Sequence, residues 1–362
     1  MVDLYRKSID VILENQAESG AYVASPAFPQ YAYCWLRDSS FIAHAMDRVG
    51  EPDSAKAFFG WADRTIQRHA WKVGKVLDKL EKGQPLDDSD YLHTRYTLEG
   101  EEATGKWWNF QLDGYGAWLW ALSEHVALTQ DWQLFEQVAP SVNVVVRYLT
   151  PLWIRPNYDC WEEHGDRVHV STLAALYGGF RGLQALRPDP ALDEIMTAIR
   201  QFVLVNAVQN SHLVKYLGTD AVDASLVAAG TPFRLISPDN PVMRATVSKI
   251  ERDLIHAGGA HRYALDTYYG GGEWTLLSAW LGWYYAESGD RARAKQYLAW
   301  VETQADENGN LPEQVSTHML FSNRFAEWEA RWGPIARPLL WAHAMYLILY
   351  ESLYPSRKAD PQ

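Results

Sequence analysis

The 362-residue chain contains only two cysteines, Cys34 and Cys160, which excludes a disulfide framework and the ligand spacing of a zinc ribbon. No calcium-binding loop is present either, so we expect neither a metal nor another cofactor. The sequence has no window of about 18 uncharged apolar residues, which argues against a membrane span. Its first residues lack the apolar core of a signal peptide, so we expect a cytoplasmic protein.

Positively charged residues are fewer than negatively charged ones. The chain has 33 Lys and Arg against 45 Asp and Glu, a formal net charge of −12. A negative surface repels phosphate backbones, which argues against a nucleic-acid partner. No linker rich in Gly, Ser or Pro divides the chain, so we expect a single domain over residues 1–362. The oligomeric state cannot be read from these features.

Aromatic residues are abundant, with 17 Trp, 20 Tyr and 11 Phe. Many of them could simply fill a large core. Alternatively, Trp and Tyr line a concave site, because flat rings with a polar edge stack on sugar or base faces. Since the net charge disfavours nucleic-acid bases, this second interpretation favours a carbohydrate ligand.

Apolar residues recur at helical spacing along nearly the whole chain. Pro52, Pro241 and Pro334 stand where a first helical turn tolerates a missing N–H, and Gly50 and Gly289 stand where helices end. A short strand is possible over residues 212–217. The spacing predicts helices near residues 2–18, 38–49, 52–81, 112–129, 131–150, 171–186, 189–209, 241–257, 273–288, 290–305 and 334–353.

Six units of about 60 residues, each long enough for two helices and two connections, would use the whole chain. We therefore predict an all-α fold, an (α/α)6 toroid of helical hairpins. An open α-solenoid is the alternative, but its repeats are shorter and more regular. Function is expected in the long aromatic connections, which are residues 19–37, 82–111, 153–170, 258–273 and 306–333.

Two adjacent carboxylates, Glu162 and Glu163, follow Trp161 shortly before a predicted helix. Like charges repel and a neighbouring indole disfavours ionisation, so one pKa is expected to rise. A carboxylic acid that stays protonated near neutral pH can act as a general acid. The alternative is that both carboxylates simply sit near a helix N-terminus, where the helix dipole favours negative charge.

A separate carboxylate, Glu313, follows Pro312 in a predicted loop. A carboxylate fixed in this way suits a base that holds a water, and the alternative is an exposed turn glutamate. Another cluster ends with Arg37 and Asp38, where Asp38 could be only an N-cap paired with Arg37. The glycines of residues 270–272 lack the Lys-Ser/Thr of a phosphate loop and would let backbone pass close to a ligand or a neighbouring loop.

Together these clusters resemble the glucoamylase-type inverting α-glucoside hydrolases, glycoside hydrolase family 15, in order over about residues 24–345. The resemblance is greatest with the compact isomaltose-hydrolysing branch. It implies that Glu162 is the general acid and Glu313 the general base. It also implies the sugar-binding residues, which are Tyr31, Trp35, Arg37, Asp38, Trp107, Trp161, Glu163, Arg262, Asp266, Trp274 and Trp341. Val315 departs from the pattern, because fungal members have a Tyr there.

The resemblance implies inverting, exo-acting hydrolysis of short α-glucosides, isomaltose first, with release of β-glucose. In this reaction the acid and the base lie roughly 6.5–9.5 Å apart, on opposite faces of the sugar. Glucoamylase action on α-1,4-glucans and trehalase action stay open, because few residues set linkage preference. An inverting phosphorylase would need a phosphate pocket in place of Glu313. A carbohydrate-binding toroid without catalysis would be expected to lack Glu162 or Glu313.

Overall fold

The computed structural model describes residues 3–355. This part of the chain is helical, with short 3-10 segments and two-residue strands between the helices. None of its helices is both long and apolar enough to cross a membrane. The helices are α1 (Leu4–Glu14), α2 (Leu36–Val49), α3 (Pro52–Glu81), α4 (Asp113–Thr129), α5 (Trp132–Leu152), α6 (Val170–Leu186), α7 (Pro190–Asn206), α8 (Pro241–Leu254), α9 (Thr275–Glu287), α10 (Arg291–Glu302), α11 (Phe325–Trp332) and α12 (Leu340–Leu353).

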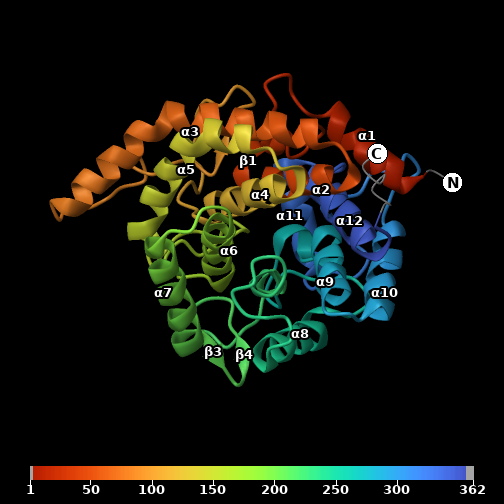
Figure 1. Ribbon diagram of the computed structural model, residues 1–362. Helices are drawn as coiled ribbons and strands as arrows, with labels where there is room; N and C mark the ends of the chain where they lie inside the picture. Colours follow the sequence, from red (N-terminus) through yellow and green to blue (C-terminus); the bar gives the residue numbers. More distant parts are fainter. Residues whose placement is uncertain (1–2, 356–362) are drawn as a thin grey trace.

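The helices form two concentric rings (Figure 1). In the inner ring α2 packs on α4, α4 on α6, α9 on α12, and α12 on α2. The 3-10 segment η2 (Ala224–Ala229) closes this ring between α6 and α9. The outer ring consists of α1, α3, α5, α7, α8 and α10. The predicted all-α (α/α)6 toroid is therefore confirmed.

The composition of the helices explains which ring each one joins. The inner helices α4, α9 and α12 are apolar on nearly all sides, and almost every residue in them is buried. The outer helix α3 is amphipathic and buries one face. Helices α4 and α6 approach closely because Gly116 has no side chain: a Cβ there would lie 2.6 Å from the carbonyl oxygen of Ala175.

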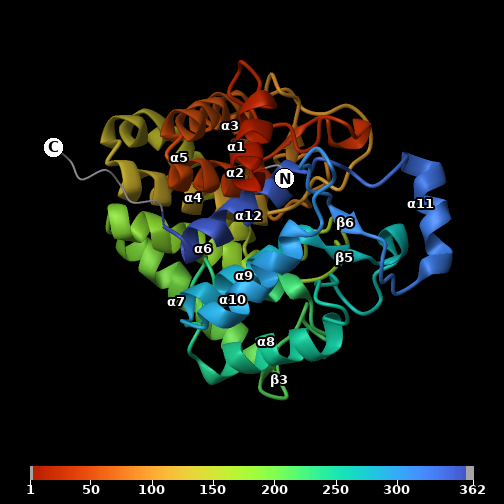
Figure 2. The same cartoon turned by 90° about the vertical axis from the view of Figure 1, so that its right-hand side faces the viewer.

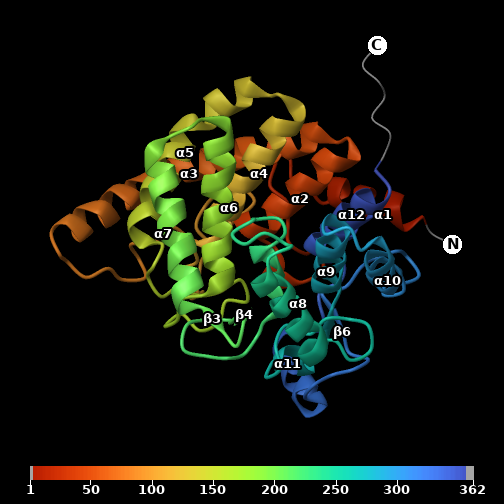
Figure 3. The same ribbon diagram turned by 60° about the horizontal axis from the view of Figure 1, so that its bottom comes forward.

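Each inner helix follows an outer one, so the inner helices begin at the same end of the ring. The long aromatic connections lead into these starts, as Figure 3 shows for the region around β6 and α11. Two of the strand pairs fasten the connections together. Strand β1 (Cys34–Trp35) pairs with β2 (Arg95–Tyr96), and β5 (Glu273–Trp274) pairs with β6 (Gln314–Val315). The positive ends of several helix dipoles thus point toward one region.

Most predicted helix boundaries agree with the structure within a few residues. Gly50 ends α2 in a left-handed conformation, and Pro52 and Pro241 begin α3 and α8. The predicted strand at residues 212–217 is shorter, since β4 (His212–Leu213) pairs with β3 (Val208–Gln209).

The last predicted helix, residues 334–353, was wrong at its start. Helix α12 begins at Leu340, because a helix from Pro334 would contain Pro338 in its second turn. Proline there lacks the N–H that the helix needs and collides with the preceding turn. Helix α11 lies in the connection 306–333, for which no helix was predicted.

Candidate active site

A cavity of about 210 Å³ opens at the end of the ring where the inner helices begin. Its wall includes the starts of α2, α9 and α12 and the connections before them. Every sugar-binding or catalytic residue expected from the sequence lines it, except Asp266. The lining residues are Ala24, Tyr31, Trp35, Arg37, Asp38, Trp107, Trp108, Cys160, Trp161, Glu162, Glu163, Arg262, Tyr268, Trp274, Leu276, Glu313, Trp328, Trp332, Leu339 and Trp341.

Glu162 occupies a tight turn over residues 159–163. The Asp159 carboxylate accepts hydrogen bonds from the backbone N–H groups of Trp161 (3.0 Å) and Glu163 (2.9 Å). Glu162 itself has φ of 66°, in the left-handed region that only a few per cent of non-glycine residues adopt. Strain of this kind persists where the surrounding contacts enforce it, and here it fixes where the side chain of Glu162 points.

One oxygen of the Glu162 carboxyl group is saturated with hydrogen bonds. Oε1 accepts from the Trp35 indole (2.9 Å), the Trp107 indole (3.0 Å) and the Gln111 amide (3.1 Å). Three donors leave this oxygen no room for a proton. A proton carried by Glu162 must therefore sit on Oε2, so the group can donate it in one direction only.

The charge repulsion expected between Glu162 and Glu163 is offset by a cation. The Glu163 carboxylate pairs with Arg262 (3.2 Å) and accepts a hydrogen bond from the Tyr263 hydroxyl (2.5 Å). Its charge is therefore compensated by Arg262 rather than directed at Glu162. The helix N-terminus alternative also fails, because α6 begins only at Val170.

Glu313 also lines the cavity and is 3% exposed, which excludes an exposed turn glutamate. The Tyr31 hydroxyl donates to its Oε1 (2.8 Å), and the Tyr268 hydroxyl lies 2.9 Å from that of Tyr31. Within residues 3–355, Oε2 is buried and has no hydrogen-bond partner. Burial raises the pKa of the Glu313 carboxyl to about 7, although the Tyr31 hydrogen bond and the Arg262 charge oppose this shift.

Arg37 and Asp38 form another part of the wall. Arg37 donates to Gln111 (2.9 Å) and Asp113 (3.1 Å), and its Nε lies 3.4 Å from an Asp38 oxygen. Burial raises the pKa of the Asp38 carboxyl to about 6; Arg37 opposes the shift and the negative charge of Glu162 adds to it. Asp38 is not the N-cap, since Trp35 holds that position and Asp38 lies in the first turn of α2.

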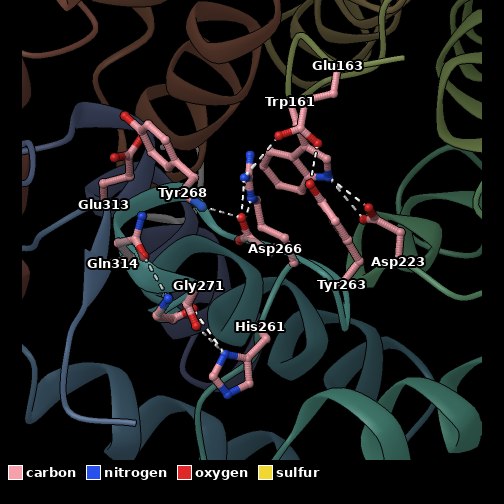
Figure 4. A network of polar contacts seen from close by, with 12 residues as sticks. Trp161, Glu163, Asp223, His261, Tyr263, Asp266, Tyr268, Gly271, Glu313 and Gln314 are labelled. Carbon is pink, nitrogen blue, oxygen red and sulfur yellow. Dashed lines mark hydrogen bonds and ion pairs between the residues drawn. The ribbon is translucent and has the colours of Figure 1, made fainter. Parts of the chain in front are cut away.

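Asp266 lies behind the cavity wall rather than in it. Its carboxylate accepts from Arg262 Nε (2.8 Å) and Nη2 (2.5 Å) and from the Tyr268 backbone N–H (2.9 Å). Figure 4 shows this network, with Tyr268 and Glu313 on one side and Trp161 and Asp223 on the other. The prediction that Asp266 contacts a sugar was therefore wrong, because its side chain does not reach the cavity. Asp266 instead holds Arg262, which does line the cavity.

Several buried polar atoms in the wall lack a hydrogen-bond partner among the described residues. They include Nε1 of Trp274 and Trp341 and Oε2 of Glu313. Buried polar groups are rarely left unpaired, so a polyhydroxylated ligand is the chemistry that would satisfy this wall. The structure between residues 3 and 355 brings no three His, Cys, Asp or Glu side chains into an arrangement that could hold a metal ion.

The sequence did not point to every residue of the wall. Trp108, Trp328 and Trp332 line the cavity and were missed, as was Gln111, which is not a lining residue but donates to Glu162. Trp328 and Trp332 lie in a connection already marked as long and aromatic, which was the available signal. Gln111 carried no signal, because its role comes from contacts with residues far away in the sequence.

The backbone glycines beside the site behave as the sequence predicted. A Cβ on Gly271 would lie 2.2 Å from the carbonyl oxygen of Asp266, and one on Gly272 would lie 2.3 Å from that of Val315. The backbone of residues 270–272 therefore passes directly against neighbouring loops. This close approach sets the position of β6 next to β5, and with it that of Glu313.

Comparisons with known proteins agree with this geometry. Isomaltose glucohydrolase of Kribbella flavida is 44% identical over 358 residues, covering 97% of this chain and 92% of that protein. Trehalase 1 of Sulfolobus acidocaldarius is 22% identical over 82% of this chain and 56% of that protein. A glycosidase variant solved in complex with glucose superposes with a TM-score of 0.94 at 44% identity, covering 97% of this chain and 96% of the other.

More distant structures share the fold alone. A bacterial glucoamylase solved with acarbose superposes with a TM-score of 0.71 at 18% identity, covering 97% of this chain and 55% of that one. The family model described as "Glycosyl hydrolases family 15" matches residues 3–306. The chain therefore belongs to glycosyl hydrolase family 15 and is a glycoside hydrolase.

Proposed function

We propose that the protein hydrolyses short α-glucosides from the non-reducing end with inversion, releasing β-glucose, and that isomaltose is its preferred substrate. The observation that carries this proposal is the pair of glutamates in one small cavity. Glu162 can present a proton only from Oε2, and Glu313 is buried with an unpartnered oxygen and a pKa of about 7. These are the properties required of a general acid and a general base near neutral pH.

In the proposed mechanism Glu162 protonates the glycosidic oxygen while Glu313 removes a proton from a water on the opposite face of the sugar. That water attacks the anomeric carbon, so the configuration inverts. The Tyr31 hydroxyl, which donates to Glu313, holds the base in place and lies beside the sugar ring on which positive charge develops. Arg37, Asp38 and the unpartnered indole groups would bind the hydroxyls of the first glucose.

A cavity of about 210 Å³ has room for only the end of a glucan chain, which supports exo action. The choice of isomaltose is supported by the 44% identity to isomaltose glucohydrolase of Kribbella flavida over 97% of this chain. We carry two further expectations as part of the proposal. The chain acts as one catalytic domain, and it works in the cytoplasm, where its two unpaired cysteines fit a reducing compartment.

Two measurements test this proposal. Proton NMR during early turnover of isomaltose identifies the first anomer released, and α-glucose as the initial product would refute inversion. Product analysis with isomaltose, maltose, trehalose and soluble starch, with and without phosphate, separates the remaining activities. Release of glucose 1-phosphate would show a phosphorylase, and a preference for trehalose or starch would replace isomaltose as the substrate.

A further inference from the structure

Helix α11 stands outside both rings of the toroid, and Figure 2 shows it at the edge of the molecule. It packs mainly against two 3-10 turns, η3 (Tyr268–Gly270) and η4 (Ser322–Arg324). None of its residues is fully buried, so it adds little to the core. The half-buried residues of α11 are Phe325, Trp328 and Trp332, which share one face at helical spacing. That face is turned toward the cavity, which Trp328 and Trp332 line.

Trp332 reaches across the mouth of the cavity. Its ring centroid lies 5.9 Å from that of Trp107, the indole that donates to Glu162. On its other side it lies 6.4 Å from Phe28, whose ring packs at 4.7 Å on Tyr31, the hydroxyl that holds the base. Trp332 therefore connects the acid side of the cavity with the base side.

This placement determines which part of a substrate Trp332 meets. The acid must reach the glycosidic oxygen, which joins the first sugar to the leaving sugar. Rings that surround Trp107 on its outer side therefore flank the leaving sugar. Trp332 is one, and Trp108 is another, with its centroid 5.2 Å from that of Trp107. Trp108 is 39% exposed, so the cavity meets solvent on that side.

Both ends of α11 are fastened to the same turn. Phe321, just before the helix, donates its N–H to the Gly270 carbonyl (2.8 Å), and the Tyr269 hydroxyl donates to the Gly333 carbonyl just after it (2.7 Å). Between these ties, the Trp328 ring meets that of Tyr268 edge to face at 5.0 Å. A helix held at both ends and along its middle is a fixed arch rather than a hinged flap.

We propose that α11 is the element that restricts this enzyme to short substrates, because Trp332 and Trp108 form a position for one leaving sugar and the arch blocks the path of a third. This inference rests on the proposed exo-hydrolysis of α-glucosides and adds the part of the chain that sets substrate length. The cavity of about 210 Å³ is smaller than the roughly 300–1,000 Å³ of pockets for drug-sized ligands, which fits so short a substrate.

The test compares kcat/KM for isomaltose and isomaltotetraose in the wild type and in Trp332→Ala. The wild type should prefer isomaltose. In Trp332→Ala, kcat/KM for isomaltose should fall about tenfold, which is the order of the energy of one aromatic contact. The fall in kcat/KM for α-glucosyl fluoride should be smaller, because this substrate has no leaving sugar. Its ratio of kcat/KM for the longer to the shorter substrate should rise at least about fivefold. Trp71→Ala, which removes a remote indole that is 61% exposed on α3, should leave the ratio unchanged.

The proposal that α11 limits substrate length would be refuted if folded Trp332→Ala keeps the wild-type ratio of kcat/KM for isomaltotetraose to that for isomaltose. It would also be refuted if the wild type already prefers isomaltotetraose. If Trp332→Ala does not fold, Trp332→Phe carries the same comparison, because a smaller ring should raise the ratio by an intermediate amount. Failure of the proposed function is a separate outcome, since it would show as a wild type that releases no glucose from any α-linked disaccharide. If maltose is the better disaccharide, maltose and maltotetraose replace the isomaltose pair.

Discussion

Replacing Glu313 by Gln should stabilise the protein at alkaline pH and not at acidic pH. Burial raises the pKa of this carboxyl from 4.5 to about 7, which corresponds to about 3 kcal/mol. The folded state binds this proton more tightly than the unfolded chain does. The contribution of protonated Glu313 to the free energy of unfolding is therefore fully present below pH 4.5. That stability is lost as the pH rises through 7. Glutamine resembles the protonated acid and carries no charge to bury at any pH.

The assay is thermal unfolding of Glu313→Gln and the wild type at pH 4.5 and pH 8.5. For 362 residues, about 3 kcal/mol corresponds to about 4 °C in Tm. The difference in Tm between variant and wild type should therefore be larger at pH 8.5 by about that amount, because titrating groups that do not interact with Glu313 contribute equally to both proteins. Exposed Glu307, replaced by Gln, is the matched control and should show no pH-dependent difference. A constant difference for Glu313→Gln at both pH values would refute the reasoning.

Three further changes test the site and the buried ion pair behind it, in which Lys215 contacts Asp223, the acceptor of the Trp161 indole N–H. The acidic limb of the kcat/KM profile should lie near pH 7, set by Glu313. Tyr31→Phe should move this limb to higher pH, because the Tyr31 hydrogen bond lowers the pKa of Glu313 and its loss raises that pKa; a pH–rate profile with α-glucosyl fluoride measures this. Glu162→Gln should lower kcat on isomaltose by about 10²–10⁴-fold and affect α-glucosyl fluoride much less, as steady-state kinetics would show; equal losses would contradict its role as acid. Lys215→Met should cost about 3–5 kcal/mol in urea unfolding, because Lys215 is buried 2.7 Å from Asp223, and Lys215→Arg should restore part of it.

The sequence predicted the ring helices well because their signals are local. Helices such as α9 and α12 are apolar almost throughout, which gives a strong pattern without any knowledge of partners. Helix α11 has eight residues and no side-chain cap, so neither its length nor its ends give a signal in the sequence. Its position depends on Tyr269 and on the backbone of Gly270, which are distant in sequence.

In the candidate site, too, local patterns could be predicted from the sequence and long-range contacts could not. Glu162 and Glu313 were found because short motifs surround them. Their physical environment was not predictable, since the three donors to Glu162 come from two connections that are distant from it in sequence, Trp35 from one and Trp107 and Gln111 from the other. The place of Asp266 behind Arg262 likewise follows from how a loop folds back on itself, which residue types alone do not reveal.

The amide of Gln111 has one end that accepts hydrogen bonds and one that donates them, and this directionality has a consequence. Arg37 and Thr94 both donate to its oxygen, so the amide cannot be flipped without losing two bonds. Its nitrogen is thereby committed to Glu162 and to the Trp108 carbonyl. Arg37, which we propose binds the sugar, and Glu162, the proposed proton donor, are thus joined through Gln111. A change at Arg37 should therefore reorient Glu162 as well as weaken sugar binding.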